Sequence, residues 1–392
     1  MTWRPTRPVH VGVLAAVVAL GFVGVRWAVA ADRDVSRFVV AGSDFVDART
    51  VDPAIHVFRG TGYDGQFYWR LGVDPADLDT GRTRGVRLDS EIRAGRIAYP
   101  LAAWGVALGH PGLVAWSLVL ANCLAVGCVA GFAAAFAADR RLAPAWGLLV
   151  AMSSGLVMSL SRDLCEVVMV AALVGGALAV GRRRPAWAAL AWSVAVLSHE
   201  QSLVVVGAYA AVRVVGLVRS RARPTAADAA WAVPVAVFAA WQVACRLAIG
   251  SFPILGSAGK NTDLPFVGLL PELRQWVTLD LSRQELLVLP QLALVVALVV
   301  VAAVRARRLD PADRWLVVAL AATLLVPATL SRNVWQGPPE LRTVVIVPTF
   351  AVLRSEGRVG QKGGVAVVGA ARAARKKSSS SKRPTSARKI LP

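Results

Sequence analysis

Long apolar runs separated by short polar segments dominate the pattern along the chain. The first run, residues 9–31, is long enough to cross about 30 Å of hydrocarbon at about 1.5 Å of helical rise per residue. Comparable runs follow at 112–137, 144–161, 164–181, 186–198, 202–218, 228–249, 287–304, 314–330 and 343–353. The pattern predicts an all-α polytopic membrane protein with about ten transmembrane helices.

The first run follows two arginines, Arg4 and Arg7. Its end, Ala28-Val29-Ala30, resembles the small-residue cleavage site of a secretory signal peptide. The run is longer than the apolar core of about 7 to 15 residues that such peptides carry. We therefore interpret it as the first span, with a cleaved signal peptide as the alternative.

Two of the runs, 186–198 and 202–218, are short for complete spans. They predict a helical hairpin that turns near His199-Glu200, inside the membrane or at its outer edge. Irregular backbone at that depth has to be covered by protein or water.

The arginines indicate the orientation, because short cytoplasmic loops carry an excess of Lys and Arg. Four clusters follow alternate spans and therefore fall on one side: Arg140 with Arg141, Arg182 to Arg184, Arg219 with Arg221 and Arg223, and Arg305 with Arg307 and Arg308. We expect that side, with both termini, to face the cytoplasm across a plasma (inner) membrane. The segments expected outside are 32–111, 250–286 and 331–342; loops as long as the first are exempt from the rule.

Half of the formal net charge of +20 lies at one end of the chain. Residues 354–392 contain eleven Lys and Arg against one Glu, among many Ser and Gly. This composition predicts a disordered cytoplasmic tail after a membrane domain at 1–353. The tail either binds anionic lipid headgroups or is a solvated topology anchor. A nucleic-acid partner is not expected, because aromatic residues do not alternate with the basic ones.

The remaining composition excludes several classes of protein. Four cysteines lie in or beside apolar runs without a Cys-x-x-Cys pair, which predicts small core residues rather than disulfides or a zinc site: Cys123, Cys128, Cys165 and Cys245. No Gly-rich nucleotide-binding loop is present, so direct use of ATP is not expected. No cofactor is required by these patterns.

The most informative polar segment lies in the first outer loop, at residues 62–75. Its Asp64 stands before a glycine, and a carboxylate at a membrane surface could act as general base toward a hydroxyl group. Four neighbours that hydrogen-bond or carry charge are candidate substrate-binding residues: Tyr63, Gln66, Tyr68 and Arg70. The alternative is that Asp64 caps a helix that starts near Gly65.

A second polar group follows at Asp89, Arg93 and Arg96, just before an apolar stretch. The two arginines are three positions apart, so they share one face if the segment is helical. Such a pair would suit a phosphate or pyrophosphate, or ordinary headgroup anchoring. Arg342, directly before the last run, could bind a lipid phosphate or mark the span boundary.

Two further polar groups interrupt apolar runs. The first holds Arg162, Asp163 and Glu166, with the two acids on one helix face; the second holds His199 and Glu200. Ionisable groups at such depth usually face a cavity or a partner, so all five are candidate site residues. The structural alternative pairs Arg162 with Glu166 or Glu200, and His199 alone is better explained as a hydrogen-bonded structural residue.

These polar segments together resemble a bacterial family of integral membrane proteins linked to the formation of cell-surface glycopolymers. The resemblance rests on Gly62 to Tyr68 with Asp74-Pro75, on Arg93 to Pro100, and on Ser161 to Leu164 with Glu166. Those proteins look like GT-C glycosyltransferases, which use polyprenyl-phosphate sugars as donors. The resemblance implies a GT-C-like membrane domain that transfers a sugar to a glycan or lipid acceptor outside the membrane.

The resemblance also implies roles for single residues. Asp64 corresponds to the acid that activates the acceptor, and the donor phosphate would lie against Arg93, Arg96 or Arg342, with inversion at the sugar. Glu200 falls where related enzymes often show an Arg-Glu pair, and His199 departs from that pattern. The first outer loop also lacks the double-acid motif of several GT-C branches.

Two other functions remain open from the sequence. A transporter or flippase for a lipid-linked glycan would place the same charges along a translocation path. A non-catalytic scaffold of a glycan assembly complex would not need Asp64. No metal is demanded for transfer, and a divalent cation that bridges Asp64 and Asp89 or Asp163 is the alternative.

Overall fold

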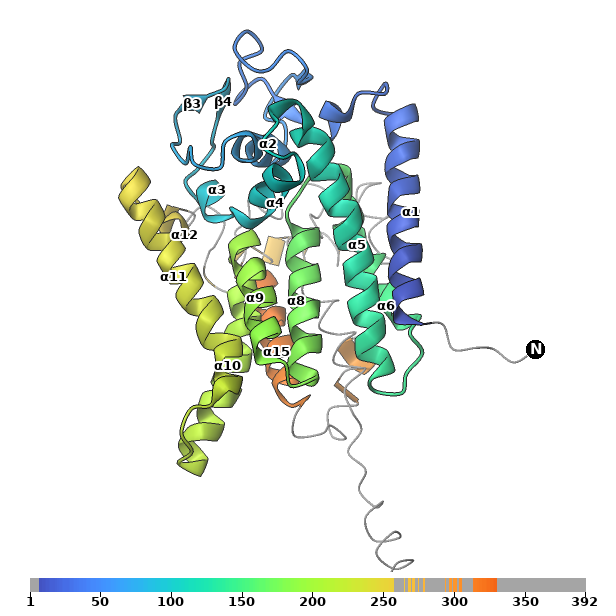
Figure 1. Ribbon diagram of the computed structural model, residues 1–392, viewed down its shortest axis with the longest axis vertical. Helices are drawn as coiled ribbons and strands as arrows, with labels where there is room; N and C mark the ends of the chain where they lie inside the picture. Colours follow the sequence, from blue (N-terminus) through green and yellow to red (C-terminus); the bar gives the residue numbers. More distant parts are fainter. Residues whose placement is uncertain are drawn as a thin grey trace, which may run out of the picture.

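The computed structural model describes residues 7–256 and 313–329, with scattered positions between 264 and 304. The described chain is predominantly helical, and the helices run side by side with a smaller folded region at one end (Figure 1). Four helical segments are long and apolar enough to cross a membrane: Pro8–Val29, Pro111–Ala138, Ser202–Ser220 and Ala226–Ile249. The prediction of a helical membrane protein therefore agrees with the structure.

Three shorter apolar helices complete the described bundle: α8 (Glu166–Gly181), α9 (Pro185–Ser198) and α15 (Trp315–Ala328). The four long segments are α1 (Pro8–Val29), η2 with α5 (Pro111–Leu113, Val114–Ala138), α10 (Ser202–Ser220) and η3 with α11 (Ala226–Asp228, Ala229–Ile249). The runs predicted at 287–304 and 343–353, and the basic tail, lie outside the described residues.

Glycines let α1 and α5 pack closely. A Cβ atom added at Gly12 would lie 2.9 Å from the Gly127 carbonyl oxygen and 3.2 Å from the Gly131 Cα. Larger side chains at Gly12 would push the helices apart. Such small-residue contacts are typical of membrane helices, which gain packing rather than hydrophobic burial when they associate.

The run at 144–161 is not the single span that its hydropathy predicted. It forms α6 (Trp146–Ala151) and α7 (Ser154–Ser161), which are separated at Met152 and Ser153. Ser153 has an extended backbone and stands at the N-cap position of α7. Hydropathy cannot detect such an interruption, because the residues on both sides of it are equally apolar.

The predicted hairpin is present. Helices α9 and α10 are joined by the short turn His199 to Gln201, and this turn meets the folded region at one end of the bundle through Glu200. Because of this contact, the turn lies at one end of the helices and not near the middle of their length.

We call residues 30–110 the outer region. It contains η1 (Val35–Phe38), β1 (Ala41–Gly42), β2 (Val57–Phe58), α2 (Gly65–Val73), β3 (Arg82–Thr83), β4 (Val86–Arg87), α3 (Ile92–Gly95) and α4 (Ala98–Val106). Strands β1 and β2 are parallel, whereas β3 and β4 are antiparallel. Buried side chains such as Val46, Phe67, Trp69 and Val86 give it a core of its own. The segment predicted as a long loop is thus a folded unit that caps the helices (Figure 1).

The opposite end of the bundle carries arginine clusters. Arg182, just after α8, bonds Asp139, just after α5, at 2.8 Å, and Arg140 bonds Asp313 at 2.9 Å. The first two of the four predicted clusters therefore lie at one end, away from the outer region. This arrangement is what the positive-inside rule leads one to expect, while the orientation itself stays a prediction.

Candidate functional site

The start of α2 is fixed by a close approach of three chain segments. A Cβ atom added at Gly65 would lie 2.5 Å from the carbonyl oxygen of Arg162 and 2.7 Å from that of Val39. The space beside this glycine is therefore filled by backbone and leaves no room there for a substrate. The contact places Asp64, at the N-cap position of α2, beside the segment that carries Arg162.

Asp64 does not cap the helix with its side chain. Its carboxylate instead accepts a 2.7 Å hydrogen bond from Nη1 of Arg93, and 14% of the side chain is exposed. The same guanidinium donates to both oxygens of Asp89, each at 2.8 Å, and lies over the ring of Phe67. The predicted capping role is therefore not observed, and Arg93 joins two carboxylates.

The Asp64–Arg93–Asp89 cluster holds two carboxylates and one guanidinium. Burial lowers the pKa of Arg93, but the charge of Asp64 and the hydrogen bonds from Asp89 raise it by more, so the guanidinium stays charged. When both acids are ionised, the cluster has one negative charge in excess. Arg93 is thus already neutralised by protein groups and does not stand open for a phosphate.

Arg96 faces a different partner. Its Nε and Nη2 bond the two oxygens of Glu200 at 2.9 and 2.6 Å. Helix α3 ends at Gly95, so Arg93 and Arg96 do not share a helix face as the spacing suggested. Burial raises the pKa of Glu200, but the charges of Arg96 and then His199 outweigh it and lower the pKa to about 2.

A buried polar layer lies under this pair. The Tyr68 hydroxyl is 3.4 Å from Nη1 of Arg96 and 3.1 Å from the thiol of Cys165. Asn122 on α5 donates to the Tyr99 hydroxyl at 2.8 Å and to the Leu164 carbonyl at 3.1 Å. Tyr68 is fully buried, and burial raises its pKa well above the usual value. Its hydroxyl contacts Arg96 and Cys165 in the interior, so burial does not favour the predicted contact with substrate, which stays a prediction.

Gln66 and Arg70 are also structural. Gln66 is 1% exposed and links two segments, because its oxygen accepts from the Gly42 backbone and its nitrogen donates to the Thr61 carbonyl, both at 2.9 Å. Arg70 is 1% exposed and donates to the carbonyls of Asp79 and Gly81. Neither side chain reaches the surface of the outer region, so burial does not favour direct substrate contact, which stays a prediction for both.

Arg162 lies over an aromatic ring. Its guanidinium carbon is 4.2 Å from the ring centre of Tyr63, the residue before Asp64. The predicted ion pairs of Arg162 with Glu166 or Glu200 are not formed. Glu166 is buried and accepts a 3.3 Å hydrogen bond from Ser159, while Glu200 binds Arg96.

Asp163 is completely buried, and neither of its carboxylate oxygens has a hydrogen-bond partner among the described residues. Its backbone is left-handed, with φ of 51°, and α8 begins only at Glu166, so the two acids do not share a helix face. Burial raises the pKa of Asp163 well above the usual value, although the charge of Arg26 opposes the shift.

His199 agrees with its interpretation as a hydrogen-bonded residue. It is 6% exposed, and its Nδ1 accepts from the Gln201 backbone at 3.3 Å. The same nitrogen lies 3.5 Å from Glu200. The histidine thus shapes the turn that presents Glu200 to Arg96.

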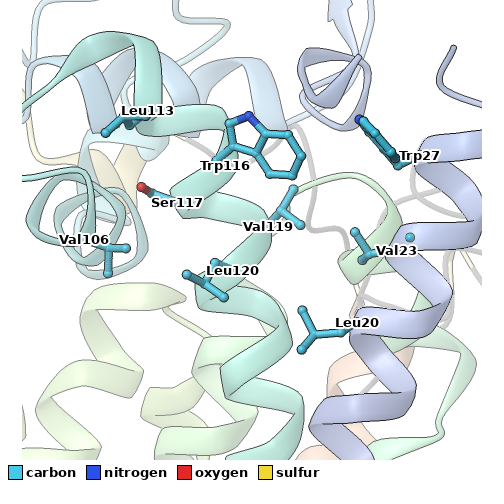
Figure 2. A pocket seen from close by; sticks show the side chains of 10 residues that line it. Leu20, Val23, Trp27, Val106, Leu113, Trp116, Ser117, Val119 and Leu120 are labelled. Carbon is cyan, nitrogen blue, oxygen red and sulfur yellow. The ribbon is translucent and has the colours of Figure 1, made fainter. Parts of the chain in front are cut away.

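An apolar groove opens between α1 and α5 close to the outer region. Its volume is about 470 Å³, and its lining residues are Leu20, Val23, Gly24, Trp27, Val106, Leu113, Trp116, Ser117, Val119 and Leu120. Figure 2 shows Trp27 and Trp116 on facing helices at one end of the groove and Leu20 and Leu120 at the other. The two indole rings are 6.2 Å apart. Aromatic rings at this level are typical of the membrane interface.

Several predicted features have a plain outcome. Arg342 lies outside the described residues. No group of three or more metal-ligating side chains occurs in the described chain. Arg93 lies between Asp64 and Asp89, at the place where the sequence suggested a bridging cation as the alternative. All four cysteines are free; three are buried and Cys128 is exposed.

Sequence reasoning missed two features of the site. Arg26 lies in the last turn of the first apolar run, where it was counted as part of a span. Its charge within an apolar helix was the available signal. The Asn122–Tyr99 contact joins two segments without any local pattern and could not be read from the chain. Comparison with protein-family models, with curated proteins and with solved structures found no match to this chain.

Proposed function

We propose that this protein is a membrane glycosyltransferase of the GT-C type. It transfers a sugar from a polyprenyl-phosphate donor to a hydroxyl of a cell-envelope glycan or lipid. The observation that carries the proposal is the Asp64 carboxylate, which is partly exposed, fixed by Arg93 and adjacent to the cationic Arg162 at one end of a helical bundle. An acid beside a cation is what displacement of a phosphate by a hydroxyl group requires.

Asp64 is the general base in this mechanism. It takes the proton of the acceptor hydroxyl while the hydroxyl oxygen forms a bond to the anomeric carbon. The bond between that carbon and the phosphate oxygen breaks, and the prenyl phosphate leaves with the electron pair. Attack opposite the phosphate inverts the anomeric configuration. The excess negative charge of the Asp64–Arg93–Asp89 cluster favours proton uptake, and arginine stabilises the departing phosphate.

The number of spans, the orientation and the role of the basic tail in this proposal rest on the sequence pattern. The complete domain, residues 1–353, has about ten spans in a plasma membrane. The outer region faces the outside, and both termini lie in the cytoplasm with the basic tail on anionic lipids. The mechanism demands no metal, because arginine side chains supply the positive charge.

One observation favours an enzyme over a transporter. The polar groups described above gather at the end of the bundle beneath the outer region, from Asp64 to Glu200. A translocation path would need polar groups along the spans. In the described part of the helices the core is instead mainly Ala, Val, Leu and aromatic side chains, and the buried polar side chains along it, such as Ser193, Gln242 and Thr323, carry no charge.

The test is complementation of a deletion strain by Asp64→Asn, with Asp44→Asn as the matched control, because Asp44 is an exposed acid of the same outer region. Envelope glycans and lipid-linked sugars are measured at equal protein levels. We expect Asp64→Asn to lose a glycan and to accumulate its donor, whereas Asp44→Asn behaves as wild type. Full rescue by Asp64→Asn would overturn transfer chemistry at this residue; donor trapped on the cytoplasmic leaflet of the deletion strain would then point to a flippase.

A further inference from the structure

Two arginines have no carboxylate within ion-pair distance in the described chain and lie beside aromatic rings of the outer region: Arg162, beside Tyr63, and Arg26, beside Phe38. Every other arginine at this site is neutralised, because Arg93 binds two carboxylates and Arg96 binds Glu200. Arg26 is held 5.3 Å from the ring of Phe38, and its buried Nε has no hydrogen-bond partner. A buried donor without a partner is costly, so it marks a place for an acceptor.

The two guanidinium groups belong to one site. Arg26, in the last turn of α1, lies over Phe38, and Arg162 precedes α8. The backbone carbonyls of Val39, the residue after Phe38, and of Arg162 both meet the Cβ position of Gly65, which brings the two segments together. The charges of both Arg162 and Asp163 act on Arg26. The nearby carboxyl of Asp163 is buried, and neither of its oxygens bonds either guanidinium group. Two like charges held together on aromatic rings favour an anion with several oxygen acceptors, such as a phosphate.

The apolar groove begins beside this pair. Trp27 follows Arg26 in α1 and lines the groove, which continues one to two turns along the helix past Gly24 and Val23 to Leu20 (Figure 2). Trp116, Leu113 and Leu120 on its other side are more than one third exposed. In a membrane this groove is open to lipid, so its occupant is a hydrocarbon chain.

We propose that Arg26 and Arg162 bind the phosphate of a prenyl-phosphate lipid whose first isoprene units lie in the groove between α1 and α5. The identity of the lipid rests on the proposed function, and the site itself rests on the two arginines and the groove. The phosphate then lies beside Asp64, because Arg162 covers Tyr63 and its backbone contacts Gly65. Arg26 becomes a phosphate-binding residue that the sequence did not identify, and Arg162 takes the role expected of Arg93 and Arg96.

The experiment measures binding of undecaprenyl phosphate to the full-length protein in phosphatidylcholine nanodiscs. We expect Arg26→Gln and Arg162→Gln each to weaken binding about tenfold or more, because each removes charge-assisted hydrogen bonds. Arg87→Gln is the matched control, since Arg87 also lies over an aromatic ring, that of Phe45. Undecaprenol, which lacks the phosphate, should bind the wild type and the arginine variants equally.

The groove has its own matched pair of variants. Gly24 lines the groove and Gly21 does not, and a Cβ atom at either position meets no atom within 4 Å. Gly24→Leu should weaken binding of undecaprenyl phosphate and of undecaprenol, whereas Gly21→Leu should leave both unchanged. Both substitutions are compatible with helix α1, so loss of folding does not explain a difference between them.

Three results would overturn the inference. The first is wild-type binding by the Arg26→Gln/Arg162→Gln double variant, and the second is equal competition by phosphatidylglycerol, which would indicate a general site for anionic headgroups. The third is competition by inorganic phosphate with no effect of Gly24→Leu, which would indicate a free-phosphate site. Loss of transfer in Asp64→Asn together with any of these would leave the proposed function standing. Lipid binding as expected, together with full activity of Asp64→Asn, would instead overturn the proposed function and leave the lipid site standing.

Discussion

Arg96 and Glu200 form a two-point ion pair between segments 104 residues apart, with nitrogen–oxygen distances of 2.9 and 2.6 Å. Arg96 directly follows α3 in the outer region, and Glu200 is in the turn between α9 and α10. The pair therefore fixes the outer region on the helical hairpin. The Tyr68 hydroxyl extends the contact to Cys165 before α8, so three segments of the chain depend on it.

The Arg96–Glu200 pair predicts acid sensitivity. Glu200 has a pKa of about 2 in the folded protein against its usual 4.5, so its contribution to stability is complete above about pH 4.5 and is lost as the pH falls toward about 2. A shift of this size corresponds to about 3 kcal/mol. Thermal unfolding in detergent, followed between pH 7 and 3, should show a falling midpoint below about pH 4.5.

Two variants test the source of that sensitivity. Glu200→Gln should lower the midpoint at pH 7 and flatten its pH dependence, because no carboxylate remains to protonate. Arg82→Gln, which removes an exposed partner of Asp47, is the control and should change little. An unchanged acid limb in Glu200→Gln would assign the pH dependence to another group.

A second prediction concerns Gly65. Its Cβ position is 2.5 Å from one backbone oxygen and 2.7 Å from another, so Gly65→Ala forces backbone and not only side chains to move. We expect a loss of about 2 to 4 kcal/mol in stability, as for other overpacked sites. Gly105→Ala is the control, because nothing lies within 4 Å of that position. Equal unfolding midpoints of the two variants would contradict the close approach.

Much of the fold could be predicted from the apolar pattern. The hairpin at His199-Glu200 agrees with the prediction because its two runs were short and separated by charged residues. The division of 144–161 into α6 and α7 was not predictable, since Met152 and Ser153 carry no breaking signal such as Pro or Gly. The folded outer region was also missed, because its buried residues are spread over short elements without a clear period.

The candidate site was predictable as a set of residues but not as a set of contacts. Charge in or beside apolar runs identified Arg93, Arg96 and Glu200, and the structure brings the first to Asp64 and the others to each other. The spacing of Arg93 and Arg96 suggested that both side chains lie on one helix face. Spacing cannot show that α3 ends between them. The pairs Arg93–Asp64 and Arg96–Glu200 join residues 29 and 104 positions apart, so tertiary packing and not local spacing decides them.

The orientation gives a third prediction. Ala48 is an exposed residue of the outer region, and Ala222 is exposed after α10 at the end that carries arginines. In intact cells, with the four native cysteines replaced, a membrane-impermeant maleimide should label Ala48→Cys but label Ala222→Cys only after permeabilisation. The positive-inside rule is the physical basis. Labelling of Ala222→Cys in intact cells would reverse the proposed orientation. The proposed reaction could then not take place outside the membrane.

The last prediction concerns Arg70, which organises the loop after α2. Its guanidinium donates to the carbonyls of Asp79 and Gly81 and lies 3.3 Å from the Asp77 carboxylate, where several oxygen atoms converge as they would on a bound cation. Arg70→Met leaves these acceptors without their donor, and removal of one partner from a buried charged contact costs about 3 to 5 kcal/mol. We expect a lower unfolding midpoint and faster proteolysis within residues 74–84. Arg49→Met is the matched control, because Arg49 is 90% exposed and its bond to Asp47 is at the surface. If the loop of Arg70→Met resists protease as well as that of Arg49→Met, backbone turns and not the buried guanidinium hold this part of the outer region together.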